Sequence, residues 1–405
     1  MEYGVIIIGA GQAAAQCAIK TRDKGYTKSI LIIGDEAYLP YQRPPLSKKY
    51  LNGQLDDQDI LIYPKSLYRD KKIEFKSSSH VQNINAKEHY ILCENGEKYY
   101  FEKLVIATGS RPNALPIDVL PQLKNVFQFR NIDDCKQIQT QLNADKNLII
   151  LGGGYIGLEL AAVAKGFGLN VYVIEKSERI LQRVASKETS EFIKSVHLKH
   201  GVNILENSEI KKFKYQEQYL TSVVLNNDQE IAADLMVIGI GVRANHELIS
   251  KIGGRIEKNA IFVDSNCKTS LDNIYAIGDC TSFDFNGEIL RLESIQNANE
   301  QAETVANQLN DISSVYNPIP WFWSDQYNLK LQIAGLGMDY NRVLSRINQE
   351  TQIASFWYLK DDVLKAVDAV NDPRSFMIAK KYLGQKVKGP DLISNVDVNV
   401  IDLFA

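Results

Sequence analysis

The sequence has little excess charge and no long hydrophobic run. Its 405 residues carry 46 lysines and arginines against 49 aspartates and glutamates, a formal net charge of -3. Without a surplus of positive charge, nucleic acid is not expected as a general partner. No segment is long and apolar enough to span a bilayer, and the four residues before the first apolar run leave no room for a signal peptide. We therefore expect a soluble cytoplasmic protein, not bound to a membrane, that is long enough for two or three domains.

Cysteine is scarce and scattered. The five cysteines are far apart in the sequence, with no Cys-x-x-Cys pair and no metal-ligand spacing. We therefore expect reduced, partly buried thiols, no metal site, and no redox disulfide between neighbouring cysteines. They are Cys17, Cys93, Cys135, Cys267 and Cys280.

The first motif is an apolar run that stops at glycine. Residues 5–8 predict a buried parallel strand, and the residues from Gln12 onward predict a helix. Between them, Gly9 permits a tight turn and Gly11 lets a pyrophosphate approach the backbone, where it meets unpaired amides and the positive end of a helix dipole. A single turn of this kind is also common for packing reasons alone. The predicted contacts are Gly9, Gly11, Ala13 and Ala14.

The same design occurs a second time. The apolar residues 148–151 run into Gly152, Gly153 and Gly154, ahead of a second predicted helix. Two copies at the same place in two strand–helix units argue against a coincidence of packing. The sequence therefore indicates two dinucleotides held against each other. The predicted contacts of the second are Gly152, Gly154, Tyr155 and Ile156.

An acidic side chain follows the second apolar strand of each unit. In the first unit, Asp35 lies somewhat over twenty residues past Gly9 and is predicted to accept both hydroxyls of an adenosine ribose, with Glu36 as the second choice and an ordinary turn acid as the alternative. In the second unit, Glu175 follows residues 171–174. A carboxylate there accepts from the ribose 2′-hydroxyl and repels a 2′-phosphate, which predicts NADH over NADPH. Arg179 and Arg183 follow closely and could instead suit a phosphate.

Residues 39–51 form a segment stiffened by proline. Pro44 and Pro45 restrict the backbone before Ser47, which we expect to start a helix, so this segment is predicted to be a rigid ledge that carries Arg43 and Lys48. The stretch Pro-Tyr-Gln-Arg-Pro-Pro-Leu-Ser-Lys resembles the signature of oxygenase-coupled NADH:ferredoxin reductases, the putidaredoxin-reductase-like and biphenyl-dioxygenase-reductase-like flavoproteins.

The resemblance implies roles for this ledge, which in that family lies against the flavin where disulfide reductases keep their cysteines. Pro45 would close that face of the flavin, and Lys48 would reach the reactive edge of the ring. A family glutamate at the position of Glu159 pairs with the ledge lysine, so Lys48 and Glu159 would form an ion pair. From the sequence pattern alone, Glu159 could equally be an exposed helical acid.

Three further motifs match the family in the same order: Ala-Thr-Gly at 107–109, Gly-Asp at 278–279, and Phe-Trp-Ser-Asp-Gln at 322–326. The resemblance places Trp323 beside the isoalloxazine, near the exit route for electrons, and aims the start of a helix near Ser294 at the flavin. The implied flavin contacts are Arg43, Lys48, Val81, Ala107, Thr108, Gly109, Arg111, Arg130, Gly278, Asp279, Glu293, Ser294, Ile295 and Trp323. The implied nicotinamide-nucleotide contacts also include Arg183, Gly239 and Gly241.

The resemblance covers essentially the whole chain and implies a glutathione-reductase-like α/β fold. This fold has two Rossmann-type dinucleotide-binding domains and a C-terminal α+β domain. We expect a split FAD-binding domain at 1–115 and 247–325, an NAD-binding domain at 116–246, and a C-terminal domain at 326–405. Pro112, Pro116 and Pro121 predict a linker at the first crossing.

The implied function is transfer of hydride from NADH to FAD. Single electrons then pass to a two-iron two-sulfur ferredoxin that feeds a haem-thiolate or Rieske oxygenase. The reductase itself is expected to be a monomer or weak homodimer. One alternative is a flavin NADH oxidase or quinone-type reductase without a protein partner, and another is a non-enzymatic NADH-sensing flavoprotein. A basic stretch near the C-terminus is either a solvated helix face or a dock for an acidic ferredoxin. It contains Arg374, Lys380, Lys381, Lys386 and Lys388.

Overall fold

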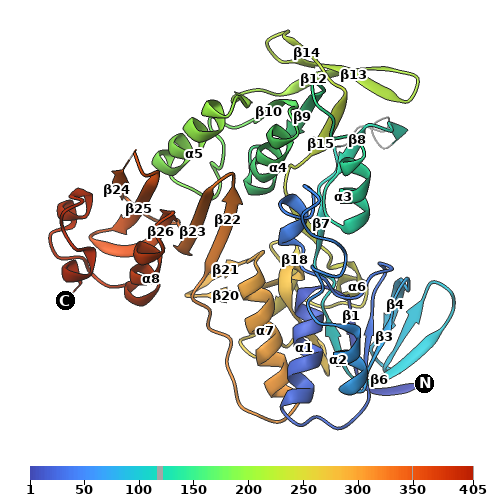
Figure 1. Ribbon diagram of the computed structural model, residues 1–405. Helices are drawn as coiled ribbons and strands as arrows, with labels where there is room; N and C mark the ends of the chain where they lie inside the picture. Colours follow the sequence, from blue (N-terminus) through green and yellow to red (C-terminus); the bar gives the residue numbers. More distant parts are fainter. Residues whose placement is uncertain (116–121, 349, 405) are drawn as a thin grey trace. The chain divides into compact units, whose positions relative to one another are not determined.

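The computed structural model describes residues 1–115, 122–348 and 350–404 and contains two compact units. The first unit comprises Met1–Arg43, Leu55–Arg111 and Val242–Pro320. The second comprises Pro44–Gln54, Pro112–Gly241 and Trp321–Ala405. Figure 1 shows the elements of each unit. Pro116 and Pro121, part of the predicted linker, lie outside the described residues.

The first unit is built on a mixed sheet with the strand order β3-β2-β1-β6-β5-β4, and β19 pairs with β6. Strands β1, β2, β3, β6 and β19 are parallel, while β4, β5 and β6 form an antiparallel meander. The valines and isoleucines of β1 and β2 are buried, as expected for strands covered on both faces. The strands are β1 (Glu2–Ile8), β2 (Ile30–Ile33), β3 (Ile73–Lys76), β4 (Val81–Asn85), β5 (Tyr90–Cys93), β6 (Lys98–Ile106) and β19 (Ile274–Ala276).

Two long helices of this unit, α1 (Gln12–Asp23) and α7 (Ile295–Gln308), lie side by side (Figure 1). Alanines dominate the buried face of α1, and the buried face of α7 combines alanines with polar side chains such as Gln296 and Asn297. The remaining elements are shorter. They are α2 (Lys65–Asp70), α6 (Glu247–Ser250), the 3-10 helix η3 (Gly278–Cys280), β7 (Ser110–Pro112), β16 (Val242–Ala244), β17 (Ile256–Glu257), β18 (Ala260–Val263), β20 (Thr281–Phe285) and β21 (Glu288–Leu290).

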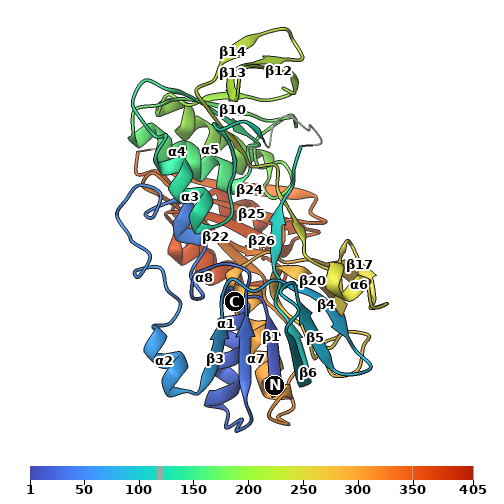
Figure 2. The same cartoon turned by 90° about the vertical axis from the view of Figure 1, so that its right-hand side faces the viewer.

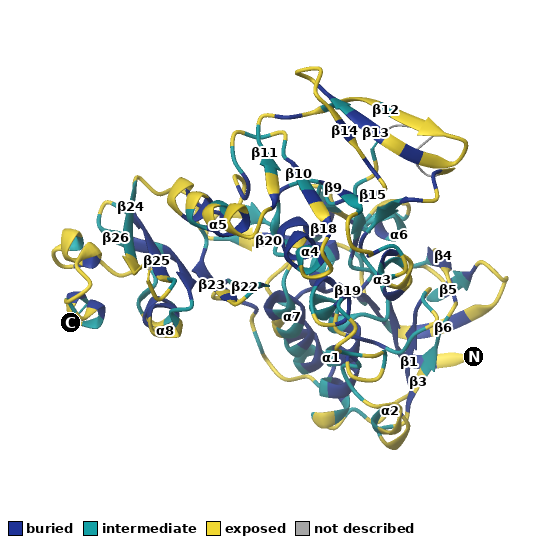
Figure 3. Cartoon of the chain, turned by 45° about the horizontal axis from the view of Figure 1, so that its top comes forward, coloured by how far each residue is buried: buried dark blue, intermediate teal, exposed yellow. Residues whose placement is uncertain are grey.

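The second unit contains a parallel sheet with the order β11-β10-β9-β15-β8. It also contains an antiparallel ribbon, β12-β13-β14 (Figure 2). Its strands β9 and β10 are mainly buried, whereas β12 is mostly exposed (Figure 3). The strands are β8 (Val126–Gln128), β9 (Asn147–Leu151), β10 (Asn170–Ile174), β11 (Asn203–Leu205), β12 (Ile210–Gln216), β13 (Tyr219–Leu225), β14 (Glu230–Ala232) and β15 (Leu235–Ile238). The helices are η1 (Pro44–Ser47), α3 (Ile132–Gln139), α4 (Tyr155–Gly166) and α5 (Lys187–Lys199).

The C-terminal part of the second unit is an antiparallel sheet with the order β22-β23-β26-β25-β24. Strands β25 and β26 are almost entirely buried (Figure 3). Helix α8 packs against β23 and β26. The elements are β22 (Trp321–Gln326), β23 (Leu329–Gly335), β24 (Arg342–Asn348), β25 (Ile353–Lys360), β26 (Val363–Val370), α8 (Pro373–Tyr382), η4 (Pro390–Ser394) and η5 (Val400–Leu403).

The predicted α/β fold class is confirmed, but three local predictions differ from the structure. Ser47 ends the short helix η1 instead of starting a helix, because the hydrogen bonds that follow it are turn-like, with the Lys48 and Tyr50 amides both donating to the Pro45 carbonyl. Residues 44–54 group with the second unit, although they were predicted within the flavin domain. Strand β22 pairs with β23, so residues 321–326 belong to the C-terminal sheet and do not close the first unit.

Asp368 is a fully buried acid on β26. Its carboxylate accepts hydrogen bonds from the Tyr358 and Thr189 hydroxyls. Burial raises its pKa from 3.8 to about 6, and these two hydrogen bonds oppose the rise. Between about pH 4 and 6 the folded protein therefore holds a proton that the unfolded chain releases, so stability falls as the pH rises through this range and levels off above it.

We expect Asp368→Asn to remove this dependence, because the amide is neutral at every pH. In urea unfolding, the variant should gain stability relative to the unsubstituted protein by up to about 3 kcal/mol between pH 4 and pH 7. His197, whose pKa is lowered by burial, titrates in both proteins and cancels in the difference. A constant difference across this pH range would contradict the expected titration.

Candidate functional site

The turn between β1 and α1 can be made only by glycine at its first position. Gly9 has a φ of 110°, and a side-chain carbon there would lie 2.1 Å from the carbonyl oxygen of Ala107. Gly11 is different, because a carbon added to it meets nothing within 4 Å. Gly9 therefore serves the close approach of two strand ends, while Gly11 leaves open space before the helix.

The turn between β9 and α4 repeats this geometry. Gly152 has a φ of 108°, and a side-chain carbon there would lie 2.4 Å from the carbonyl oxygen of Gly239. Gly154 again faces open space. Gly157, absent from the predicted contacts, allows α4 to pack on the turn, since its added carbon would lie 2.2 Å from the Gly152 oxygen.

The first turns of α1 and α4 are suited to bind anions. Their N-cap residues, Gly11 and Gly154, offer no side-chain acceptor to the helix amides. Among the other described helices of eight residues or more, each N-cap side chain accepts from a first-turn amide. Those caps are Asn131 on α3, Ser186 on α5, Ser294 on α7 and Asp372 on α8. The two glycine turns thus leave amides and helix dipoles available to phosphates, which fits a dinucleotide at each.

The acids after β2 lie in different environments. Asp35 is exposed. Glu36 accepts hydrogen bonds from the Tyr41 hydroxyl and the Arg43 guanidinium, each at 2.5 Å. Arg43 is therefore held in place by Glu36, and Asp35 keeps its carboxylate at the surface, where a ribose could reach it.

The Ala-Thr-Gly and Gly-Asp motifs come together in the first unit because β6 and β19 are neighbouring parallel strands. The Ser110 hydroxyl donates to the Asp279 carboxylate at 2.9 Å. Gly278, with a φ of 80°, donates its amide to Gln301 at 2.7 Å. Ser110 and Gln301 were missed from the sequence, because one hydroxyl and one helical amide carry no distinguishing pattern.

Other residues of the first unit that are predicted to contact the flavin interact with neighbouring protein groups. Arg111 forms an ion pair with Glu247 and a hydrogen bond with Asn245. The Thr108 hydroxyl donates to the Asn245 carbonyl at 2.7 Å. Val81 is buried on β4. At the start of α7, Ser294 caps the helix before Ile295, and Glu293 forms an ion pair with Arg291.

The predicted ion pair between Lys48 and Glu159 is present in the second unit. The Lys48 ammonium lies 2.7 Å from a carboxylate oxygen of Glu159, whose side chain is only 4% exposed, against 16% for Lys48. Lys48 also donates to the Pro44 carbonyl at 3.2 Å, and Pro45 is half-buried. Glu159 is therefore a buried acid and not an exposed helical one. Trp323, half-buried on β22, packs against Trp321 with ring centroids 5.6 Å apart.

Glu175 lies at the second glycine turn. Its two carboxylate oxygens accept from the amides of Gly153 and Ser177, each at 2.8 Å. Arg179 donates to Ser186 and Ser190, so its guanidinium is engaged with the start of α5. The exposed Arg183 lies next to Gly241, since a carbon added to that glycine would be 3.3 Å from the guanidinium.

The remaining predicted contacts of the second unit point in different directions. The Tyr155 ring packs on Phe322, with centroids 5.0 Å apart, whereas Ile156 is 41% exposed. Arg130 follows β8, and its backbone amide donates to Asp134 at 2.8 Å. The sequence-based roles of these side chains stay predictions.

All five cysteines are buried and free. Burial raises the pKa of the Cys17 and Cys135 thiols to about 12 and of Cys280 to about 11, and raises that of Cys93 and Cys267 as well. At neutral pH these residues are thiols, not the thiolates that attack a disulfide or bind a metal. In the part of the chain that the structure describes, no cluster of metal-ligating side chains occurs, and no helix is long and apolar enough to cross a membrane.

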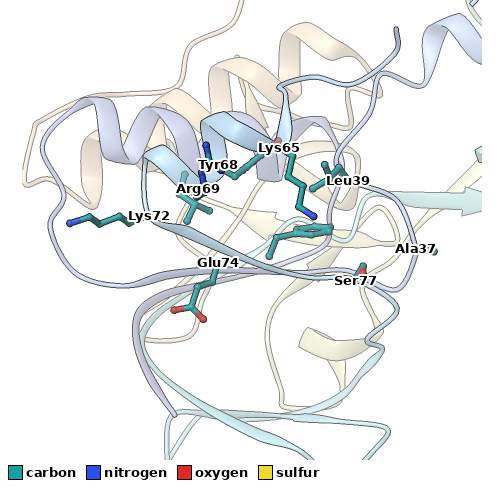
Figure 4. A pocket seen from close by; sticks show the side chains of 10 residues that line it. Ala37, Leu39, Lys65, Tyr68, Arg69, Lys72, Glu74 and Ser77 are labelled. Carbon is teal, nitrogen blue, oxygen red and sulfur yellow. The ribbon is translucent and has the colours of Figure 1, made fainter. Parts of the chain in front are cut away.

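A pocket of about 600 Å³ lies in the first unit beside α2 and β3 (Figure 4). Its lining combines cations such as Lys65 and Arg69 with the apolar side chains of Leu39 and Phe75. Lys72 points away from Leu39 in this view. None of the residues predicted to contact a cofactor lines this pocket.

Comparisons with known proteins agree with this geometry. Residues 3–302 match the family described as pyridine nucleotide-disulphide oxidoreductase, and residues 321–399 match that described as reductase C-terminal. Rhodocoxin reductase of Rhodococcus erythropolis is 34% identical over 385 residues, covering 95% of this chain and 90% of that protein. Putidaredoxin reductase of Pseudomonas putida is 32% identical over 408 residues, covering 99% and 96%. A solved covalent putidaredoxin reductase–putidaredoxin complex matches with a TM-score of 0.94 at 32% identity, covering 98% and 97%.

The chain therefore belongs to the pyridine nucleotide-disulphide oxidoreductase family, whose members use a flavin and a pyridine nucleotide. Within that family it groups with the oxygenase-coupled ferredoxin reductases, which confirms the resemblance carried by the proline ledge.

Proposed function

We propose that the protein is an FAD-dependent NADH:ferredoxin reductase that serves an oxygenase. The observation that carries the proposal is the pair of uncapped glycine turns in a chain whose five cysteines are all buried thiols. Two dinucleotides can be held, and no thiol pair stands ready to accept electrons from the flavin. The flavin supplies the chemistry, since it accepts a hydride and can release electrons singly.

We assign the first glycine turn, Asp35, and the Ala-Thr-Gly and Gly-Asp segments to FAD, and the second glycine turn with Glu175 to NADH. The split flavin domain (1–115 and 247–325), the inserted NAD domain (116–246) and the C-terminal domain (326–405) are part of this proposal as functional domains. As compact units, residues 44–54 and 321–325 group with the second unit instead. In this proposal Lys48 and Glu159 form an ion pair near the flavin, Pro45 closes one face of the flavin, and Trp323 lies on the route by which electrons leave. The other flavin and nicotinamide-nucleotide contacts that the family resemblance implies complete the two binding sites.

The acceptor we propose is a two-iron two-sulfur ferredoxin. The match to a solved reductase–putidaredoxin complex over nearly the whole chain supports a protein acceptor. The basic residues of α8 and the following segment, including Lys380 and Lys381, suit an acidic partner. Such redox encounters are small and transient. We also propose that the reductase is a monomer or weak dimer and that it acts in the cytoplasm.

The function is tested by reducing the purified holoprotein with NADH without oxygen and then mixing it with ferredoxin or with air. We expect rapid transfer to ferredoxin, slow reoxidation by air, and no loss of activity after iodoacetamide, because the thiols are buried. Fast reoxidation by air alone would favour the oxidase instead. Negligible transfer to any iron–sulfur acceptor would favour the NADH sensor.

Glu175 should set the preference for NADH. We expect Glu175→Ala to lower the ratio of kcat/KM for NADH over NADPH by about 10- to 100-fold, since a hydrogen bond to a charged group contributes about 1.5–3 kcal/mol and the repulsion of a 2′-phosphate is removed. The control is Glu178→Ala, which removes an exposed acid three residues further on. An unchanged ratio in the Glu175 variant would refute this role.

A further inference from the structure

The buried carboxylate of Glu159 is the end of a longer polar chain within the second unit. One carboxylate oxygen accepts from Lys48 and from the Ser47 hydroxyl, at 2.7 and 2.5 Å. The other accepts from the Ser324 hydroxyl at 2.6 Å. Ser324 lies on β22 and is fully buried. Lys48 is thus one of several donors that hold Glu159.

The series of hydrogen bonds continues from Ser324 into the protein interior. Gln326, two residues along β22 and therefore on the same face, donates its amide to the Ser324 oxygen at 3.1 Å. The side-chain oxygen of Gln326 lies 2.8 Å from Nε2 of His197 on α5. His197 in turn lies 3.2 Å from the Tyr327 hydroxyl through Nδ1. Gln326 is 3% exposed and His197 is fully buried.

Donors and acceptors fix the direction of every bond in this chain. Ser324 gives its proton to the carboxylate, so its oxygen accepts from the Gln326 amide nitrogen. The Gln326 oxygen then needs a donor, which must be the Nε2 hydrogen of His197. The Nδ1 atom of His197 is left as an acceptor for Tyr327. A neutral imidazole fits this pattern, and burial lowers the His197 pKa to about 4.

We propose that Ser324, Gln326 and His197 are positioning residues that hold the Glu159 carboxylate in a single orientation toward Lys48. The consequence for the flavin rests on the proposed function, whereas the hydrogen-bond chain does not. Lys48, which directly follows η1, forms the ion pair with Glu159. Tyr327 and His200 face His197, and the exposed His200 stacks on Tyr327 with ring centroids 3.7 Å apart.

Removing a link should let the Glu159 side chain leave this orientation. The holoprotein is mixed with NADH alone, without ferredoxin, and the rate of flavin reduction is measured against the concentration of NADH. We expect the rate at saturating NADH to fall about tenfold in Ser324→Ala, the change that loss of one hydrogen bond to a charged group brings, with the apparent Kd for NADH unchanged. Gln326→Met should lower the rate in the same way, and Ser324→Thr, which keeps the hydroxyl, should restore it.

The matched control is Ser355→Ala. Ser355 is equally buried in the same sheet and accepts from the Trp357 indole at 3.1 Å, but it has no link to Glu159 in the described residues. Its removal should leave the rate of flavin reduction unchanged. Equal rates for the Ser324, Gln326 and Ser355 variants would overturn the proposal.

Nitrogen NMR of the histidine rings supplies a test that needs no turnover. In the holoprotein His197 should be neutral with its proton on Nε2 from pH 5 to 8, and its ring shifts should change in Ser324→Ala but not in Ser355→Ala. A proton on Nδ1, or no response of the ring shifts to Ser324→Ala, would overturn the proposed hydrogen-bond chain from Glu159 to His197. If NADH fails to reduce the unsubstituted protein, the proposed function fails, and the NMR result alone decides the positioning role.

Discussion

Alanine at Gly11 is expected to give a folded protein that loses its flavin, and alanine at Gly154 a yellow protein that NADH can hardly reduce. Neither added carbon meets a protein atom within 4 Å, and neither glycine has a positive φ. The substitutions should therefore leave the free energy of unfolding nearly unchanged. The added methyl group would instead occupy the space through which a pyrophosphate reaches the helix amides.

We expect the kcat/KM for NADH to fall at least about 100-fold in Gly154→Ala, since this corresponds to the loss of roughly 3 kcal/mol of charged hydrogen bonding. Flavin content, measured from the visible spectrum, should fall in Gly11→Ala alone. The control is Gly166→Ala at the other end of α4, where an added carbon also meets nothing. If Gly154→Ala kept full activity with NADH, the second turn would not hold the nucleotide.

The second large effect concerns the ion pair of Lys48 and Glu159. Removing one partner leaves the other charge buried without compensation, which costs about 3–5 kcal/mol for fully buried pairs and less here, because Lys48 is 16% exposed. We expect Lys48→Met and Glu159→Gln each to destabilise the second unit by about 2 kcal/mol. The double variant should cost clearly less than the sum of the two.

Urea unfolding followed by tryptophan fluorescence measures this cycle, because Trp321, Trp323 and Trp357 all belong to the second unit. The control is the exposed pair Lys211 and Asp228, with side chains 60% and 77% exposed, where removal of a partner should cost no more than about 1 kcal/mol. A coupling energy for the buried pair no larger than that of the exposed pair would contradict its predicted strength.

The two glycine turns could be predicted from the sequence because their signals are local. An apolar run, a glycine with no side chain and a helix follow one another within about ten residues, and the backbone rules that join them do not depend on distant parts of the chain. The structure accordingly places both Gly9 and Gly152 in the left-handed region at a strand end.

Partners that are distant in the sequence could not be predicted in the same way. The ion pair of Lys48 and Glu159, 111 residues apart, was expected only from the family resemblance. Strand β22 could be recognised as a strand, but its pairing with β23 in the C-terminal sheet depends on tertiary packing. The chain from His197 through Gln326 to Ser324 joins a helix to a strand far along the sequence, and no spacing rule brings these residues together.

An anaerobic reductive titration of the holoprotein counts the electrons that each bound flavin accepts. Electrons should enter as a pair and leave through the flavin without help from sulfur, because every cysteine is a buried, free thiol. We expect each protein to take up two electrons per bound flavin and, once reduced, to reduce two molecules of ferredoxin. Uptake of four electrons per flavin would reveal a redox-active disulfide and contradict this transfer through the flavin alone.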